Sequence, residues 1–313
     1  MSSEQLPYTD YGGVMRKRLG GRVQKLAIDA AISCPNRDGG VAYGGCTFCL
    51  NEAFSPSYCR EATSITEQIE RGIAFHKARR REGDIYLAYL QSGSNTYGDI
   101  DHLERIYNET LTHPAISGII IGTRPDCISS EILDILEHIS KQYFVSIEYG
   151  IESTSDATLT HVNRGHNFAQ ACEAIALTRE RNIECGAHFI LGLPNETREQ
   201  IVAHTEQINR LDIQSIKFHQ LQIYRNTAMA KEWEMHPERF LFAQGTTAEE
   251  YTSLIVEIIR HLKPSIAIER IASVAPHHLL LHSPLKGVRP DTLREMVISK
   301  MRALGATQGD LAK

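Results

Sequence analysis

The sequence lacks the features of a membrane-bound or exported protein. No apolar run reaches the roughly 20 residues that a transmembrane helix needs, and the first five residues are too polar for the apolar core of a signal peptide. The seven cysteines show no disulfide framework, which is typical of a reducing compartment. We therefore expect a cytoplasmic protein without membrane contact.

The chain also has no internal repeat, no low-complexity segment and no excess of positive charge. Its formal net charge of -5 at pH 7 disfavours nucleic acid as the main partner. Two basic clusters run against this average, at residues 16–18 and at Lys77, Arg79, Arg80 and Arg81. Solvated positions at a helix end explain such clusters most simply.

A second group of closely spaced cysteines is missing as well. After Cys46 and Cys49 no further C-x2-C occurs, so we do not expect an auxiliary metal cluster. The other four cysteines are of a type commonly buried as small hydrophobic residues. They are Cys59, Cys127, Cys172 and Cys185.

The most informative feature that is present is a C-x11-C-x2-C stretch formed by Cys34, Cys46 and Cys49. Three thiolates leave one iron of a 4Fe-4S cluster without a protein ligand, and a small molecule can bind there. The alternative metal is zinc, with Cys59 as a fourth ligand. Structural zinc sites usually pair two short hooks, and this chain has only one. The spacing favours a catalytic cluster, and a zinc-stabilised binding protein without catalysis is the alternative.

Short apolar segments alternate with helical patterns along most of the chain. Near-continuous apolar strands are typical of a parallel sheet covered by helices, so the pattern predicts an α/β fold with a partial (β/α)6 TIM-like barrel. Capping-box patterns at Ser64 and Thr197 predict two helix starts, the first helix running to about residue 82. The predicted strands are residues 23–30, 85–90, 119–121, 143–147, 183–191 and 216–223.

This pattern divides the chain into three parts. We predict an N-terminal lead at residues 1–22, a barrel at residues 23–225 and a C-terminal extension at residues 226–313 that packs on the barrel. The extension contains helical patterns, one short strand and a loop. They are residues 248–262 and 291–304, residues 266–268, and residues 276–284.

Unusual polar residues follow the predicted strands, where barrel enzymes place their working residues. These stretches are residues 91–96, 123–126, 148–153 and 192–197. Lys217 and His219 share one face of the sixth predicted strand, which is either the interior or the outside of the barrel. Arg124 and Asp126 have the spacing to pair with each other across Pro125. Glu148 either pairs with a neighbouring cation or binds a ribose.

These residues resemble the radical S-adenosylmethionine enzymes in their partial-barrel form, over residues 23–224. The long first cysteine spacing resembles the radical domain of the elongator catalytic subunit. The stretches C-P-N-R-D-G, G-G-C-T-F-C, G-T-R-P-D-C and N-R-G-H resemble the YhcC-type bacterial group. No segment resembles the acetyltransferase half of the elongator subunit, so acetyl transfer is not expected.

The resemblance implies two cofactors, a 4Fe-4S cluster and S-adenosylmethionine, with Cys34, Cys46 and Cys49 as cluster ligands. Arg164 matches an arginine that pairs with the cofactor carboxylate, a role that suits a guanidinium fork. The implied cofactor contacts are Phe48, Gln91, Ser92, Gly93, Ser94, Asn95, Thr123, Arg124, Glu148, Arg164, Ile190, Gly192 and Leu193. The candidate catalytic or substrate residues are Asp126, Glu152, His188, Lys217 and His219.

The resemblance also implies an activity. S-adenosylmethionine would be cleaved reductively to methionine and a 5′-deoxyadenosyl radical, which abstracts hydrogen from a substrate that the sequence does not identify. An electron donor such as flavodoxin or ferredoxin is the implied partner. The elongator likeness makes a tRNA-modifying radical enzyme the alternative, with tRNA as substrate.

Overall fold

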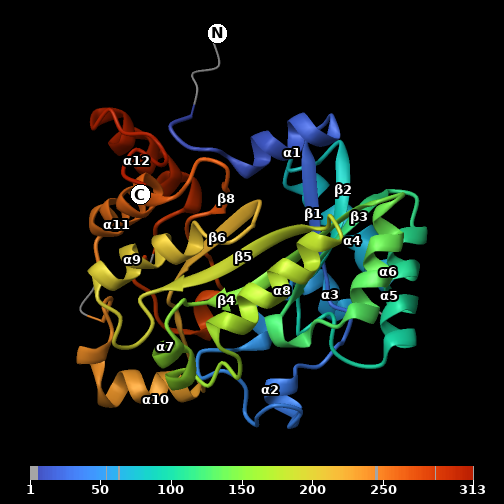
Figure 1. Cartoon of the computed structure of the whole chain (residues 1–313), viewed down its shortest axis with the longest axis horizontal. Helices are drawn as coiled ribbons and strands as arrows, with labels where there is room; N and C mark the ends of the chain where they lie inside the picture. Colours follow the sequence, from blue (N-terminus) through green and yellow to red (C-terminus); the bar gives the residue numbers. More distant parts are fainter. Residues whose placement is uncertain (1–5, 54, 63, 244–245, 286, 313) are drawn as a thin grey trace.

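A seven-stranded, entirely parallel sheet forms the centre of the molecule in our computed structural model (Figure 1). The structure describes residues 6–53, 55–62, 64–243, 246–285 and 287–312. The strand order is β1-β2-β3-β4-β5-β6-β8, so β1 and β8 are the edges of an open barrel. The strands are β1 (Val23–Ile28), β2 (Ile85–Leu90), β3 (Ile116–Thr123), β4 (Phe144–Glu152), β5 (Glu184–Leu191), β6 (Ser215–Gln220) and β8 (Ala267–Arg270).

Helices cover the outer face of this sheet and both of its ends (Figure 1). The longer ones are α1 (Tyr11–Leu19), α4 (Ile65–Ala78), α5 (Ile100–Thr112), α6 (Ser130–Ser140), α8 (Phe168–Glu180), α9 (Arg198–Ile208), α11 (Ala248–His261) and α12 (Pro290–Ala303). Shorter ones are α2 (Pro35–Asp38), α3 (Ser57–Glu61), α7 (Asp156–His161) and α10 (Ala228–Met235). Helix α1 lies at one end of the strands, and α2 lies at the other. The predicted α/β partial barrel is confirmed.

Both predicted helix starts are confirmed. The Ser64 hydroxyl accepts from the backbone N–H of Glu67 at 3.1 Å, which begins α4. At α9 the box is complete, because Thr197 and Gln200 satisfy each other's backbone N–H groups. Helix α4 ends at Ala78, earlier than predicted, and the next turn contains Arg80 with a positive φ of 52°.

Several other predicted boundaries were also wrong; for example, β1 ends at Ile28 and β3 extends over Ile116–Thr123. Strand β4 continues to Glu152, and the segment 216–223 divides into β6 and the separate β7 (Ile223–Tyr224). At the division, the side-chain amide of Gln220 bonds to both backbone groups of Ser273 at 2.8 Å. The predicted loop 276–284 contains β9 (Leu280–His282), which pairs antiparallel with β7.

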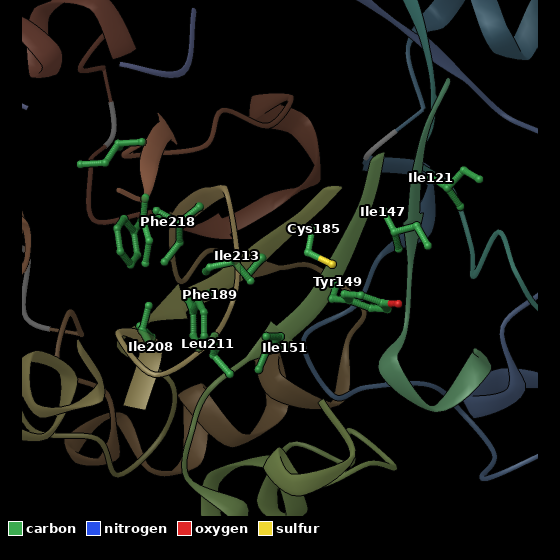
Figure 2. Close-up of a cluster of buried hydrophobic side chains, with 14 of the residues drawn as sticks. Ile121, Ile147, Tyr149, Ile151, Cys185, Phe189, Ile208, Leu211, Ile213 and Phe218 are labelled. Atoms are coloured by element: carbon green, nitrogen blue, oxygen red, sulfur yellow. The ribbon is translucent and has the colours of Figure 1, made fainter. Parts of the chain in front are cut away.

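Side-chain alternation along the strands separates a hydrophobic layer from a polar interior. Ile147, Tyr149 and Phe218 lie in the main hydrophobic cluster between the sheet and its helices (Figure 2). Glu148 and Lys217 alternate with them and therefore face the barrel interior. The face of β6 that carries Lys217 and His219 is thus the one toward the barrel interior, and not the one toward the outside.

The two ends of the described chain meet at the β8 edge. The backbone N–H of Ile268 donates to Thr9 O at 2.8 Å, and the Gln308 N–H donates to Pro7 O at 2.9 Å. The side chain of Gln308 also accepts from the Thr9 N–H. This edge of the sheet is therefore covered by chain rather than left open for pairing. In the part of the chain that the structure describes, no helix combines the length and apolarity needed to cross a membrane.

Gly118 offers a test of the β3–β4 packing. A Cβ at this position would overlap the carbonyl oxygen of Phe144 in β4. We expect Gly118→Ala to lower the free energy of unfolding by about 1–3 kcal/mol, measured by urea denaturation. The neighbouring Ser117 is exposed on the same strand, so Ser117→Ala should change it by no more than about 0.5 kcal/mol. Equal effects of the two substitutions would contradict this packing.

Candidate active site

A cavity of about 340 Å³ lies inside the open barrel, and the three clustered cysteines form part of its wall. Cys34 precedes α2, and Cys46 and Cys49 follow the turn that returns from it. Gly44 and Gly45 make this turn with positive φ values of 81° and 78°, a conformation that glycine adopts without strain. The sequence-predicted trio Cys34, Cys46 and Cys49 therefore lines one cavity.

Hydrogen-bond donors surround two of these thiols. Asn36 Nδ2 and Arg164 Nη1 each lie 3.4 Å from Cys46 Sγ, and Arg37 Nη2 lies 3.5 Å from Cys49 Sγ. Burial and the neighbouring Cys46 raise the pKa of the Cys49 thiol, while the charges of Arg37 and Arg164 oppose that rise. Guanidinium groups beside cysteines favour thiolates, the form that binds metal. The donors around Cys46 and Cys49 would suit sulfur ligands of a metal cluster.

The other four cysteines are not part of the cavity wall. Cys59 Sγ donates to Ala27 O at 3.2 Å and is outside the cavity wall, so it does not join the trio. Cys185 lies on the outer face of β5 within the main hydrophobic cluster, and Cys172 packs against that cluster from α8. Burial raises the pKa of the thiols of Cys59, Cys127 and Cys185 to about 12. These are the properties of small buried side chains.

The loop after β2 reaches the cavity with three of its predicted residues, Gln91, Gly93 and Ser94. A Cβ on Gly93 would overlap the Ile32 carbonyl oxygen, and its φ is 77°, so this position requires glycine. Two other predicted contacts hold the loop instead. Ser92 Oγ bonds to Ser55 Oγ at 2.6 Å, and Asn95 Nδ2 donates to the carbonyls of Leu90 and Gly122.

Two arginines border the cavity beside the cysteines. Arg124 forms a two-bond pair with Asp126 at 2.9 and 2.7 Å, as one reading of the sequence expected. Arg164 donates to Gly150 O and lies 3.4 Å from Glu152 Oε1. Among the described residues, Arg124 Nη1 and Arg164 Nε are buried and have no hydrogen-bond partner. Such buried donors are costly unless a ligand satisfies them.

Glu152 occupies a strained position at this site. Its φ is 72°, and the β4–β5 register shifts between Gly150 and Glu152. A bulge of this kind re-aims side chains beside a functional site, and here it turns Glu152 toward Arg164 and the cavity.

The remaining predicted contacts divide between the cavity and its surroundings. Phe48, Thr123, Glu148, His188, Ile190, Lys217 and His219 line the cavity. Asp126 does not, because it is turned to Arg124. Gly192 and Leu193 also lie outside the wall. A Cβ on Gly192 would overlap the Phe242 ring, and Leu193 is buried in a second hydrophobic cluster.

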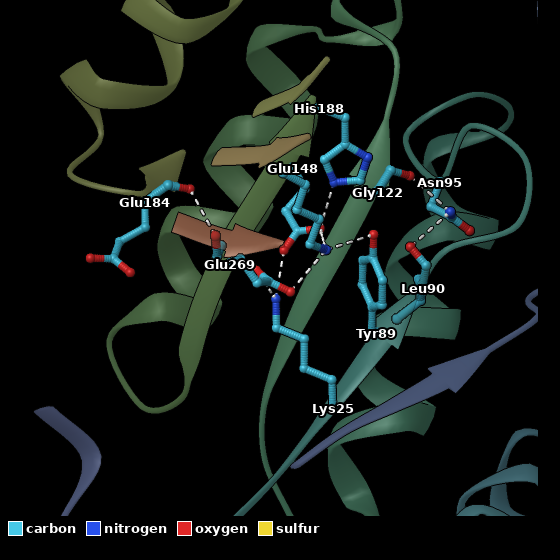
Figure 3. A network of polar contacts seen from close by, with 11 residues as sticks. Lys25, Tyr89, Leu90, Asn95, Gly122, Glu148, Glu184, His188 and Glu269 are labelled. Carbon is cyan, nitrogen blue, oxygen red and sulfur yellow. Dashed lines mark hydrogen bonds and ion pairs between the residues drawn. The ribbon is translucent and has the colours of Figure 1, made fainter. Parts of the chain in front are cut away.

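A closed ring of four charges crosses the interior of the barrel, shown in part in Figure 3. Lys25 Nζ lies 2.7 Å from Glu148 Oε1 and 2.6 Å from Glu269 Oε2. Lys217 Nζ contacts Glu148 Oε2 and lies 3.1 Å from Glu269 Oε1. Each carboxylate therefore bridges both lysines. We call these four residues the ionic ring.

Aromatic and imidazole groups complete the surroundings of the ring. Lys217 Nζ donates to Tyr89 OH at 3.3 Å, and His188 Nε2 lies 2.9 Å from Glu148 Oε2. The His188 and His219 rings lie 5.4 Å apart. Of the two readings of Glu148, the structure shows the pairing with cations, and the same residue also lines the cavity.

The ring shifts the ionisation of its members. Burial raises the pKa of Glu148, but Lys217, Lys25 and His188 outweigh it and hold that pKa well below its ordinary value. Burial likewise lowers the pKa of Lys25, and the two carboxylates outweigh it and raise that pKa. The pKa of Lys217 is lowered, because burial outweighs the same two carboxylates. We take both lysines as charged, since each has two carboxylate partners.

Sequence reasoning missed Lys25, Tyr89, Glu269 and Arg270, of which Tyr89 and Arg270 line the cavity. One signal for Lys25 was available, because it is the one charged residue of β1 and lies at an inward position. Glu269 and Arg270 gave no such signal, because a register shift between β6 and β8 decides whether their side chains face the barrel interior.

Comparisons with known proteins agree with this geometry. Residues 39–208 match the family profile described as the Radical SAM superfamily, and residues 213–303 match the Radical_SAM C-terminal domain. The chain is 35% identical to Protein YhcC of Escherichia coli strain K12 over 273 residues, which is 87% of this chain and 85% of the relative.

Two further proteins share the fold or part of the sequence. The tRNA uridine(34) acetyltransferase of Dehalococcoides mccartyi is 25% identical over 65% of this chain and 42% of its own length. The solved structure of Elp3 from Methanocaldococcus infernus, with residues 1–46 deleted, superposes with a TM-score of 0.66 and 15% identity. The match covers 91% of this chain and 64% of that one. The structural likeness to Elp3 shows that the two chains share a fold.

The depressed pKa of Glu148 predicts a pH-dependent stability. The Glu148 carboxylate contributes fully to the free energy of unfolding above its unfolded-state pKa, near 4.5. This contribution is lost as the pH falls through the lower folded-state pKa. Glu148→Gln should lower the free energy of unfolding by about 3–5 kcal/mol at neutral pH, since it breaks a buried pair. Urea denaturation should also show that, below about pH 5, Glu148→Gln loses less free energy of unfolding than the wild type does. The exposed Glu206→Gln is the control, and equal pH slopes in all three proteins would contradict the assignment.

Proposed function

Because the chain belongs to the Radical SAM superfamily and is an enzyme of that class, we propose that it cleaves S-adenosylmethionine reductively. One electron breaks the carbon–sulfur bond, which yields methionine and a 5′-deoxyadenosyl radical. The radical takes a hydrogen atom from the substrate and leaves as 5′-deoxyadenosine. The observation that carries this proposal is the lining of one cavity by Cys34, Cys46 and Cys49 together with the donors of Arg164.

The residues present suit the cofactors that this family uses. Cys34, Cys46 and Cys49 would hold a 4Fe-4S cluster, which supplies the electron for the cleavage when it is bound. The unpaired Nε of Arg164 suits the carboxylate of S-adenosylmethionine. Gly93 and Phe48 line the cavity, where the loop of Gly93 would face the methionine moiety and the Phe48 ring would face the adenine.

The cavity wall also fits the task of protecting a radical. Glu148, Lys217 and Arg164 are buried and already engaged, so their positions are set before substrate enters. Positioned groups and a water-poor interior are what the protein contributes when a cofactor carries the chemistry. We expect flavodoxin or ferredoxin as the electron donor and the cytoplasm as the location.

Family membership removes the alternative of a zinc-stabilised protein without catalysis. That alternative needed Cys59 as a fourth ligand. The structure gives Cys59 a different environment, because its thiol donates to the Ala27 carbonyl at the end of β1.

Cys46 provides the direct test of the proposed chemistry. After anaerobic purification and cluster reconstitution, the wild type should contain iron and sulfide and form 5′-deoxyadenosine from S-adenosylmethionine under dithionite. Cys46→Ala should lose both the iron signature and the cleavage, since one of three ligands is gone. Cys172→Ala, in α8, is the matched control and should behave like the wild type. Cleavage that persists in Cys46→Ala would refute the proposal.

A second candidate function is radical modification of tRNA. It is favoured by the partial likeness to a tRNA uridine(34) acetyltransferase, of whose length the chain covers 42%. The exposed residues Arg79, Arg80 and Arg81 after α4 offer a patch for phosphates. The match to the acetyltransferase leaves more than half of that protein unaccounted for, so acetyl transfer is not proposed for this chain.

Salt-dependent binding separates this candidate from a small-molecule substrate. If tRNA is the substrate, a triple Arg79, Arg80 and Arg81 to Gln variant should bind tRNA more weakly. Its slope of log affinity against log salt should fall by about 0.9 for each lost phosphate contact. The control is Arg210→Gln, because Arg210 is exposed but paired with Glu206. Filter binding that detects no tRNA at low salt would exclude the candidate.

A further inference from the structure

A bulge in β8 turns two successive side chains into the barrel. Strands β6 and β8 pair Ile216 with Ile268 and then Lys217 with Arg270, so Glu269 is the extra residue. A bulge of this kind re-aims side chains and is frequent beside active sites. Paired residues of neighbouring strands point to the same face of a sheet, so Arg270 shares the inward face of Lys217. Glu269 joins the ionic ring, and Arg270 lines the cavity.

The charges around the cavity leave Arg270 without a counterion. Arg37 contacts Cys49, Arg124 pairs with Asp126, and Arg164 pairs with Glu152. The ionic ring contains two lysines and two carboxylates and is neutral as a unit. Within the described parts of the chain, the Arg270 side chain forms no hydrogen bond or ion pair. Arg270 is an exposed residue, and its charge influences the pKa values of Lys217 and His219.

His219 lies two residues beyond Lys217 on the same face of β6 and also lines the cavity. Burial, followed by His188 and Arg270, holds the pKa of His219 well below its ordinary value, so the ring is neutral. Hydrogen-bond partners for its nitrogens do not occur among the residues that the structure describes. A neutral imidazole can donate one N–H to a ligand oxygen.

We propose that Arg270 and His219 bind an anionic group of the substrate, either a carboxylate or a phosphate. A guanidinium fork matches both groups geometrically, and the neutral imidazole adds a donor without adding charge. The ligand is the substrate of the radical chemistry, so this inference rests on the proposed function. It names the chemical class of substrate that the cavity would bind. The subsite combines His219 of β6 with Arg270 of β8, which belongs to the predicted C-terminal extension.

Arginine labelling tests the subsite locally. Reconstituted enzyme with S-adenosylmethionine bound is treated with phenylglyoxal, and the rate of modification of Arg270 is read from its peptide by mass spectrometry. Inorganic phosphate and acetate are compared at constant ionic strength with chloride. Phosphate or acetate should slow the labelling of Arg270, and the anion that protects indicates a phosphorylated or a carboxylic substrate. The exposed Arg289 should be unaffected by either anion.

Two results would overturn the subsite. One is labelling of Arg270 that neither anion changes. The other is full protection of Arg270 by S-adenosylmethionine alone, because the residue would then belong to the cofactor. The measurement does not use cleavage. If 5′-deoxyadenosine fails to form while anions still protect Arg270, the proposed radical chemistry fails and the subsite stands.

Substitution gives a second, independent measurement. By isothermal titration, Arg270→Gln should weaken binding of the protecting anion about tenfold or more, and Arg270→Lys should keep part of the affinity, since it keeps the charge without the fork. His219→Asn should have a smaller effect than Arg270→Gln. Arg289→Gln is the matched control. Unchanged affinity in Arg270→Gln, with the fold intact by circular dichroism, would refute the proposal.

Discussion

The ionic ring is the interaction on which the rest of the structure depends. An open parallel barrel has two edge strands that no backbone ladder joins, and here these are β1 and β8. The pair between Lys25 and Glu269 spans that opening, and Glu148 and Lys217 tie the pair to β4 and β6. Ion pairs between side chains thus connect the two edge strands, which no backbone hydrogen bonds join. The closure works because every charge has two partners and no net charge is buried.

The same ring sets the character of the cavity. Glu148 and Lys217 contribute their side chains both to the ring and to the cavity wall, so the interior beside the cysteines is polar yet internally balanced. A ligand that enters the cavity meets few groups that could still form a hydrogen bond or ion pair with it. Among the described residues these include the buried donors of Arg124 and Arg164 near the cysteines, and Arg270 with His219 on β8 and β6. Both pairs favour anionic or oxygen-rich groups.

The α/β barrel and the cysteine trio could be predicted from the sequence, because they rest on strand periodicity and local spacing. The role of Arg164 was predicted from the family resemblance of the N-R-G-H stretch. It could not place Ser92, Asn95, Gly192 or Leu193, since neighbours in a loop can face the cavity or hold the loop. The ionic ring was not predicted from the sequence for another reason. Its four members come from strands far apart in the chain, and no local pattern says that Lys25 meets Glu269.

The register shift in β8 connects the stability of the fold to its chemistry. Without the extra residue, strand alternation would send one of Glu269 and Arg270 outward. The ring would then lose its second carboxylate and carry a net positive charge, or the cavity would lose its unpaired arginine. Both residues belong to the predicted C-terminal extension, yet one completes the barrel and the other lines the cavity. A division at residue 225 therefore remains a prediction about chain segments, whereas the active cavity needs residues from both sides of it.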